Sequence, residues 1–203
     1  MTGFLKRDFY LISGTLRFYI LLIGLLALFA TFSDFNISFL SLYMVIFAMS
    51  GMMGLFSYDD MNRWQAYGAA VPAGRRAMVD ARCLLAVLLA VWVAAVQFLL
   101  ELLWREEGAL SMTATYGGLS LFYAAVSLPV FYRFGGTKAR TVMIAIVAAL
   151  SSLIGMGATA LQLSGGFGRV FPPVAIFALP LAGLAALALS RRISLGIMER
   201  KKL

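Results

Sequence analysis

Six long apolar stretches alternate along the chain with short polar segments. Each stretch is close to the roughly 20 residues that a helix needs to cross a hydrocarbon core of about 30 Å. The apolar residues form continuous runs, whereas the wall of a membrane barrel would alternate between apolar and polar positions. The pattern therefore predicts six membrane-spanning helices, at 18–33, 37–56, 83–104, 112–132, 141–163 and 170–190.

Composition favours a membrane protein over a soluble one. Of the 203 residues, 62% are hydrophobic and only 13% are charged, whereas soluble domains carry about 25% charged residues. In water, much of this apolar surface would be exposed, so the lipid bilayer must be the solvent for a large part of the chain. We expect an all-α integral membrane protein that forms a single transmembrane domain over residues 1–203.

The net charge of +8 could indicate nucleic-acid binding, because a basic stripe attracts phosphates. The basic residues, however, lie in short clusters between the apolar runs, as membrane topology requires. With six spans, Arg105 and Arg169 fall on one side and the remaining 15 of the 17 Lys and Arg residues on the other. The positive-inside rule then predicts two cytoplasmic termini. We expect a multi-pass protein of a bacterial inner or plasma membrane, without a nucleic-acid partner.

The longest polar segment, 58–82, predicts a short helix on the cytoplasmic side. Either Asp59 or Asp60 can cap its N-terminus, and Pro72 would end it. Three apolar side chains share one face of this helix at i, i+3 and i+7: Trp64, Tyr67 and Val71. This face could lie among the lipid headgroups or dock on a cytoplasmic partner, and both interpretations stay open. A second helix from about Arg75 would lead into the third span.

The two ends of the chain also carry a pattern. Within residues 1–17, aromatic and aliphatic side chains alternate with Lys6, Arg7 and Asp8, as in amphipathic helices that lie on a membrane surface. Ser13-Gly14 could form an elbow between this helix and the first span. Residues 191–203 predict a basic cytoplasmic tail.

The chain lacks the residues that most catalytic sites need. It contains no histidine, which excludes Ser–His hydrolysis and most imidazole proton relays. It also has no GxxxxGK[ST] loop to hold nucleotide phosphates. We therefore expect no catalytic, cofactor or metal site in this chain. Glu101, one turn after Gln97 in the third span, is a functional candidate as an intramembrane acid, although an i, i+4 pair with Arg105 would make it structural.

The polar segment resembles that of a known family. Residues 58–67 read Tyr-Asp-Asp-Met-Asn-Arg-Trp-Gln-Ala-Tyr, and residues 71–76 read Val-Pro-Ala-Gly-Arg-Arg, followed by Val79. This resembles the pattern acid–x–x–x–x–Trp–x–x–Tyr … Leu–Pro–x–Ser/Gly–Arg–x–x–x–Val of small permease subunits of type-2 ABC exporters, among them exporters of amphipathic peptides. The six spans, amphipathic N-terminus and basic tail fit the same family. The stretch 69–71 departs from it, because bulkier leucines are usual there, and so do the short outer loops.

The resemblance implies a permease that pairs with a second copy or a paralogue and with separately encoded ATPase subunits, which would bind ATP. The positions that match the family's ATPase-coupling element are Asp59, Asp60, Trp64, Tyr67, Pro72, Arg75 and Arg76. Spans two and five border the transport route in this family, which suggests the pathway candidates Met44, Phe47, Met52, Met53, Ser151, Thr159 and Gln162. Such an adaptable surface with little fixed charge favours an amphipathic peptide or a lipid-like substrate. The alternatives are a solute-binding component of an uptake system and a membrane assembly protein that transports nothing.

Overall fold

The computed structural model of this chain describes residues 2–32, 37–71, 74–104, 109–163 and 173–200. Nearly all of these residues are helical, and no strand occurs among them. The continuous apolar runs explain this outcome, because a backbone in lipid has to satisfy its hydrogen bonds within its own segment. The predicted all-α class is confirmed.

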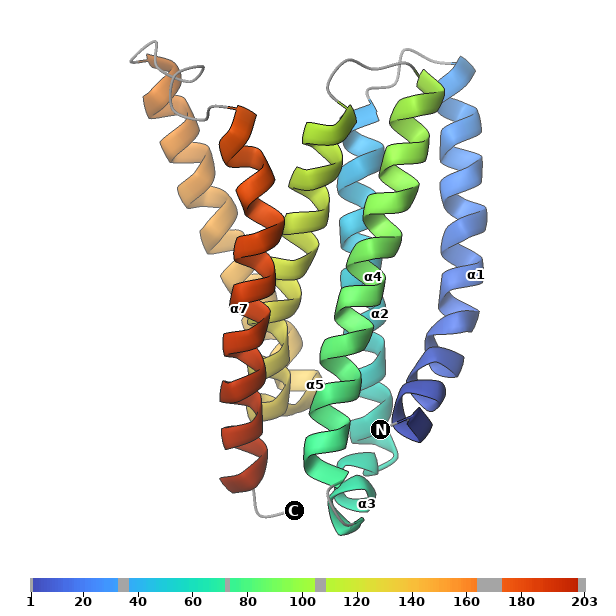
Figure 1. Ribbon diagram of the computed structural model, residues 1–203, viewed down its shortest axis with the longest axis vertical. Coiled ribbons are helices and arrows are strands. Elements are labelled where there is room, and N and C mark those ends of the chain that lie inside the picture. Colours follow the sequence, from blue (N-terminus) through green and yellow to red (C-terminus); the bar gives the residue numbers. More distant parts are fainter. Residues whose placement is uncertain (1, 33–36, 72–73, 105–108, 164–172, 201–203) are drawn as a thin grey trace.

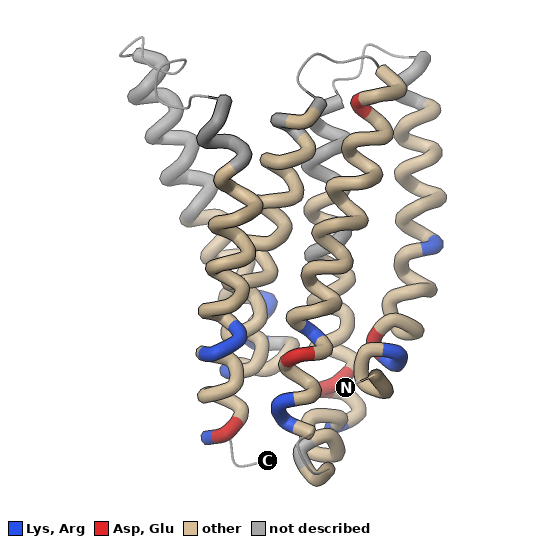
Figure 2. The backbone as a smooth tube through the Cα atoms, viewed as in Figure 1, with Lys and Arg blue, Asp and Glu red and all other residues tan. Residues whose placement is uncertain are grey.

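The long helices run side by side in an elongated bundle (Figure 1). They are α1 (Thr2–Phe32), α2 (Ile37–Met61), α4 (Gly74–Trp104), α5 (Ala109–Leu163) and α7 (Pro173–Arg200). The short α3 (Trp64–Ala70) lies at one end of the bundle, where both chain termini also lie. Figure 2 shows that the described Lys and Arg residues gather toward this same end. We refer to it below as the basic end.

Helix α5 consists of two limbs that meet at Gly135. This residue has φ 77° and ψ 173°, which are not helical angles, and glycine adopts a positive φ at little steric cost. The chain reverses direction within α5 (Figure 1). The two limbs coincide with the predicted spans 112–132 and 141–163, and the connection expected between them is mostly helical.

Within the described part of the chain, four segments are long and apolar enough to cross a membrane: Thr2–Leu28, Gly74–Trp104, Thr113–Gly136 and Ala178–Arg200. The other two predicted spans, 37–56 and 141–163, coincide with helix in α2 and in the second limb of α5. Part of each lies outside the residues whose side chains are described, so the number six stays a prediction. The helix expected from about Arg75 is confirmed, because α4 begins at Gly74.

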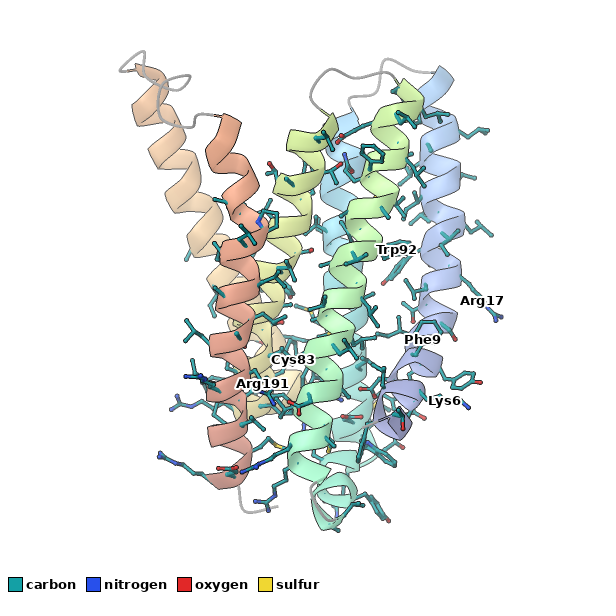
Figure 3. All side chains as sticks on the ribbon, viewed as in Figure 1. Lys6, Phe9, Arg17, Cys83, Trp92 and Arg191 are labelled. Atoms are coloured by element: carbon teal, nitrogen blue, oxygen red, sulfur yellow. The ribbon has the colours of Figure 1, made fainter. Side chains whose placement is uncertain are left out.

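The two ends of the chain are more helical than expected. Helix α1 continues through Ser13-Gly14, so a separate elbow helix is not confirmed. Its first turns are nevertheless two-sided: Asp8 and Ile12 are buried, whereas Lys6 and Arg17 point away from the bundle (Figure 3). At the other end, α7 reaches Arg200, so most of the predicted tail continues the last helix.

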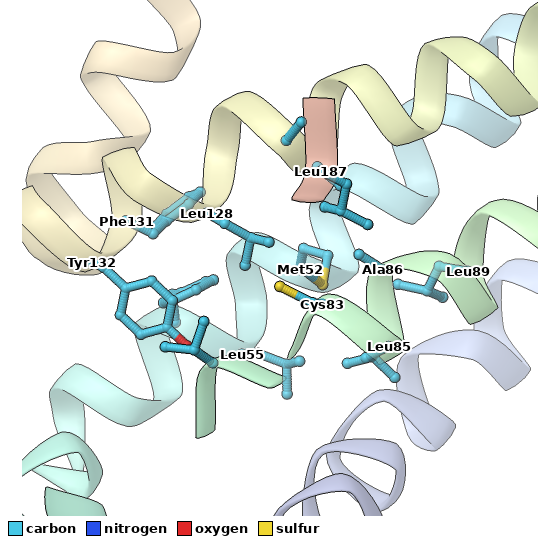
Figure 4. Packing of buried hydrophobic residues seen from close by; sticks show 14 of the residues in the cluster. Met52, Leu55, Cys83, Leu85, Ala86, Leu89, Leu128, Phe131, Tyr132 and Leu187 are labelled. Carbon is cyan, nitrogen blue, oxygen red and sulfur yellow. The ribbon is translucent and has the colours of Figure 1, made fainter. Parts of the chain in front are cut away.

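The main core lies in the half of the bundle near the basic end. Phe56 of α2 stacks on Phe131 of α5, with ring centroids 4.7 Å apart, and meets the ring of Tyr132 edge-on at 5.2 Å. Aliphatic side chains of α2, α4, α5 and α7 surround these rings, among them Met52, Leu55, Leu85, Leu128 and Leu187 (Figure 4). Small residues let helices approach closely: a Cβ atom on Gly183 of α7 would lie 2.8 Å from Cβ of Leu121 on α5.

Candidate functional site

The segment between α2 and α4 forms the short helix that was predicted, but its N-terminus differs. Arg63 occupies the N-cap position with left-handed angles, φ 49° and ψ 32°, and no side chain caps the helix. The prediction that Asp59 or Asp60 caps it was wrong. Both residues instead lie in the last turns of α2, where their carboxylates already have partners.

Asp59 is fully buried and belongs to an ion cluster formed by three helices. Its Oδ1 accepts a hydrogen bond of 2.7 Å from Nη2 of Arg7 on α1, and its Oδ2 accepts one from Nη2 of Arg82 on α4. Asp8 of α1 adds a second carboxylate, with Oδ2 3.6 Å from Nε of Arg82. We call Arg7, Asp8, Asp59 and Arg82 the ion cluster. It links α1, α2 and α4 at the basic end of the bundle, next to α3.

Arg82 lies at the centre of this cluster, and its side chain is only 1% exposed. Its guanidinium carbon is 3.9 Å from the ring centroid of Phe56 and 5.8 Å from that of Tyr132, so aromatic faces complete the shell around the cation. A buried charge costs several kcal/mol unless it is paired. The two carboxylates and the rings therefore explain how a charged residue is tolerated among apolar helices.

Arg7 extends the cluster to the loop helix. Its guanidinium carbon is 4.1 Å from the ring centroid of Trp64, and Phe4 meets the same indole edge-on with centroids 6.4 Å apart. The first turns of α1 thus pack against α3. Trp64 is half-buried by these contacts, so it serves first as the attachment of α3 to α1.

Asp60 connects the end of α2 to the reversal in α5. Its Oδ2 accepts a hydrogen bond from the backbone N–H of Gly136. Glycine is needed here for its positive φ, and a Cβ atom at Gly135 would lie 2.9 Å from the same oxygen and displace the carboxylate. The carboxylate satisfies one of the free N–H groups at the start of the second limb of α5, as an N-terminal cap does.

Three apolar side chains in and beside α3 are exposed at this end. Met61, Tyr67 and Val71 are 83%, 69% and 51% exposed. Tyr67 lies on the exposed side of α3, while Gln65 and Gly68 are buried on the other side. Val71 follows the helix as its C-cap residue in an extended conformation, so the predicted helical face shared by Trp64, Tyr67 and Val71 is not formed. Arg75 donates to the carbonyl oxygen of Glu199 at 3.2 Å, and Arg76 lies 3.6 Å from its carboxylate, which attaches the last turn of α7 to α4. Pro72 lies outside the described residues.

Only some of the side chains proposed to line the transport pathway belong to the described part of the structure. Met44 and Met52 are buried within the bundle, at 0% and 3% exposure, and Met53 is half-buried. The side chains of four candidates lie outside those described: Phe47, Ser151, Thr159 and Gln162. Their place on a transport route stays a prediction.

Glu101 is buried inside the bundle far from the basic end. Its Oε1 accepts a hydrogen bond from Nε2 of Gln97, and the two residues are 2% and 1% exposed. Arg105, the partner considered from the sequence, lies outside the described residues. The pair packs near the apolar cluster that includes Ile23, Met44, Val93 and Leu100, and the hydrogen bond to Gln97 helps to hold this acid inside the bundle.

The ion cluster was not predicted from the sequence, because Arg7 and Arg82 entered only the count of cytoplasmic basic residues and Asp8 was assigned to an amphipathic helix. A signal was present for two of them. Asp8 lies one turn before Ile12, and Arg82 lies one turn after Met78, so each occupies the apolar face of its helix. A charged side chain on the apolar face of a helix must either pair with an opposite charge or stay outside the packed interior.

The comparisons with known proteins agree with this architecture. The chain matches the family described as ABC-2 family transporter protein over residues 3–199. No curated protein and no solved structure matches it. Because the match runs from the first turn of α1 to the last turn of α7, this membrane protein belongs to the ABC-2 family of transporter proteins.

Proposed function

We propose that this chain is the permease subunit of an ATP-driven exporter and that α3 docks on a separate ATPase subunit. Family membership supports a transport role, and the sequence has no phosphate-binding loop of its own. The observation that carries the proposal is the exposed apolar face of α3, with Tyr67 69% exposed. ATP binds to the partner, and this chain needs no cofactor of its own.

The ion cluster supports the transmission of force from α3. Asp59 and Arg82 join α2 to α4, Arg7 joins both to α1, and Asp60 adds the reversal of α5. A displacement of α3 by the ATPase would therefore move the ends of four helix segments together. Two paired bundles would alternate between two relative arrangements. The nucleotide state of the ATPase would shift the equilibrium between them, because a ligand favours the conformation that it binds more tightly.

The proposal includes a second bundle, formed by another copy or by a paralogue. In the single chain, Met44 and Met52 are packed in the interior, so they would line a route between two bundles only after the helices rearrange. The second and fifth spans of the two bundles would border this route, as in the family that the loop sequence resembles.

The proposed topology has six spans and two cytoplasmic termini in a bacterial inner or plasma membrane. The gathering of Lys and Arg at the end that holds both termini supports it (Figure 2). A reporter that is active only in the cytoplasm should work when fused after Leu203 and fail when inserted within 105–111. The reverse activities of the two fusions would contradict the orientation.

The proposed substrate is an amphipathic peptide, whose apolar face can contact Met side chains while its polar face stays hydrated. The permease and its ATPase, reconstituted in vesicles, should hydrolyse ATP faster when a cationic amphipathic helical peptide is added. A peptide of the same composition in scrambled order, without an apolar face, is the control and should stimulate much less. Stimulation by small hydrophilic solutes, with no response to the amphipathic peptide, would contradict the proposal.

A further inference from the structure

A groove with a volume of about 400 Å³ opens between α4 and α7 near the basic end. Most of its wall is apolar and is formed by Cys83, Leu84, Val87, Leu184, Leu187 and Ala188. Asp80 and Arg191 complete its lining, and Figure 3 shows Cys83 and Arg191 on these neighbouring helices. Leu84 and Leu184 are 38% and 44% exposed, so the groove is open to the surrounding lipid.

The guanidinium group of Arg191 is available to bind an anion in this groove. Only its Nε is used within the described part of the chain, in a 2.6 Å hydrogen bond to Oδ1 of Asp80. Its side chain is 48% exposed, and no described residue accepts from its two terminal nitrogens. A guanidinium with free terminal nitrogens suits the oxygen atoms of a phosphate, which it can bind through two parallel hydrogen bonds.

The charges around the groove are mainly positive. Arg192 follows on α7 and is exposed. Arg75 and Arg76 of α4 lie at the same end, where both interact with Glu199. These cations add to the attraction of Arg191 for an anionic lipid headgroup.

We propose that the groove between α4 and α7 binds one anionic phospholipid, with its phosphate on Arg191 and an acyl chain along the apolar wall. The order of side chains fits this molecule: the leucines face the hydrocarbon, and the arginine lies toward the end of the bundle where headgroups are expected. Asp80 holds the guanidinium through Nε and leaves the other nitrogens for the lipid. This site goes beyond the proposed transport function and does not depend on it.

The test uses the purified full chain in detergent, equilibrated with equal amounts of phosphatidylglycerol and phosphatidylcholine, with retained lipids counted by native mass spectrometry. The wild-type protein should retain mainly phosphatidylglycerol. Arg191→Gln should lower this retention about fivefold, the effect of one basic residue at an anionic membrane surface. Arg17→Gln removes an exposed arginine of α1 that points away from the bundle and lies outside the groove. It is the matched control and should leave the preference for phosphatidylglycerol nearly unchanged.

Two further variants separate lipid binding from structural damage. Asp80→Asn breaks the same ion pair but keeps the cation, so retention of phosphatidylglycerol should stay equal or increase. Ala188→Trp fills the groove and should reduce retention of both lipids. Equal retention of the two lipids by the wild type, or equal losses in Arg191→Gln and Asp80→Asn, would overturn the proposal. A dimer that Ala188→Trp separates without altering the bound lipid would assign the groove to a second copy and would also overturn it.

Discussion

Replacing Arg82 with glutamine is expected to destabilise the bundle by about 3–5 kcal/mol, the usual cost of removing one partner from a buried ion pair. The substitution leaves Asp8 and Asp59 buried at 3% and 0% exposure, with only Arg7 to compensate two carboxylates. It also removes the cation from the rings of Phe56 and Tyr132. The purified variant should show a much lower midpoint of thermal unfolding in detergent and a lower yield of folded protein.

Two comparisons make this result specific. Arg192→Gln removes an exposed arginine near the same end and should change stability by less than about 0.5 kcal/mol. The double variant Asp59→Asn with Arg82→Gln replaces a charged pair by two neutral amides, so it should lose less than the sum of the single changes. An Arg82→Gln protein that unfolds within a degree or two of the wild type would show that the buried cluster contributes little to the fold.

Replacing Tyr67 with alanine is expected to leave the bundle folded and to abolish most of the ATP turnover that depends on the permease. The side chain is 69% exposed on α3, so the change removes little internal packing. An aromatic anchor at a protein interface typically contributes about 2 kcal/mol or more, which corresponds to a roughly 30-fold weaker association. The measurement is ATP hydrolysis by the purified ATPase as a function of permease concentration.

Tyr10 provides the matched control for Tyr67, because it is an equally exposed tyrosine, at 66%, on another helix. Tyr10→Ala should keep normal coupling. Trp64→Ala is a less specific test, because the indole contacts Phe4 and Arg7 and its loss would also loosen α1. Equal turnover in the Tyr67→Ala and wild-type proteins would indicate that α3 lies among lipid headgroups instead of on an ATPase.

Much of the fold could be predicted because continuous apolar runs have few structural solutions in a membrane. The existence of α3 and the start of α4 follow from local signals. Trp64 and Tyr67 fall at helical spacing in the polar segment, and a second helix was expected from about Arg75. The reversal in α5 was placed correctly between 132 and 141. The compact form of this reversal was not predicted. It depends on the positive φ of Gly135 and on the carboxylate of Asp60, which together let two helices meet without a loop.

The partners of the charged residues could not be predicted in the same way. Arg7, Asp59 and Arg82 are separated by many residues, and only the packing of three helices brings them together. From the sequence, Asp59 was equally suited to cap a helix or to dock on a partner. Its burial at 0% exposure assigns it to the interior, and the docking surface of α3 is left to Tyr67, Val71 and neighbouring Met61.

The most direct measurement of the proposed coupling is photo-crosslinking from position 67 in living cells. A photoreactive phenylalanine analogue replaces Tyr67 in one strain and Tyr10 in a second, and the crosslinked species are identified by peptide mass spectrometry. Position 67 should capture a protein with a GxxxxGK[ST] loop and no membrane segment, and position 10 should not. Crosslinks from position 67 to lipid alone, or the same ATPase captured from both positions, would contradict the proposed coupling.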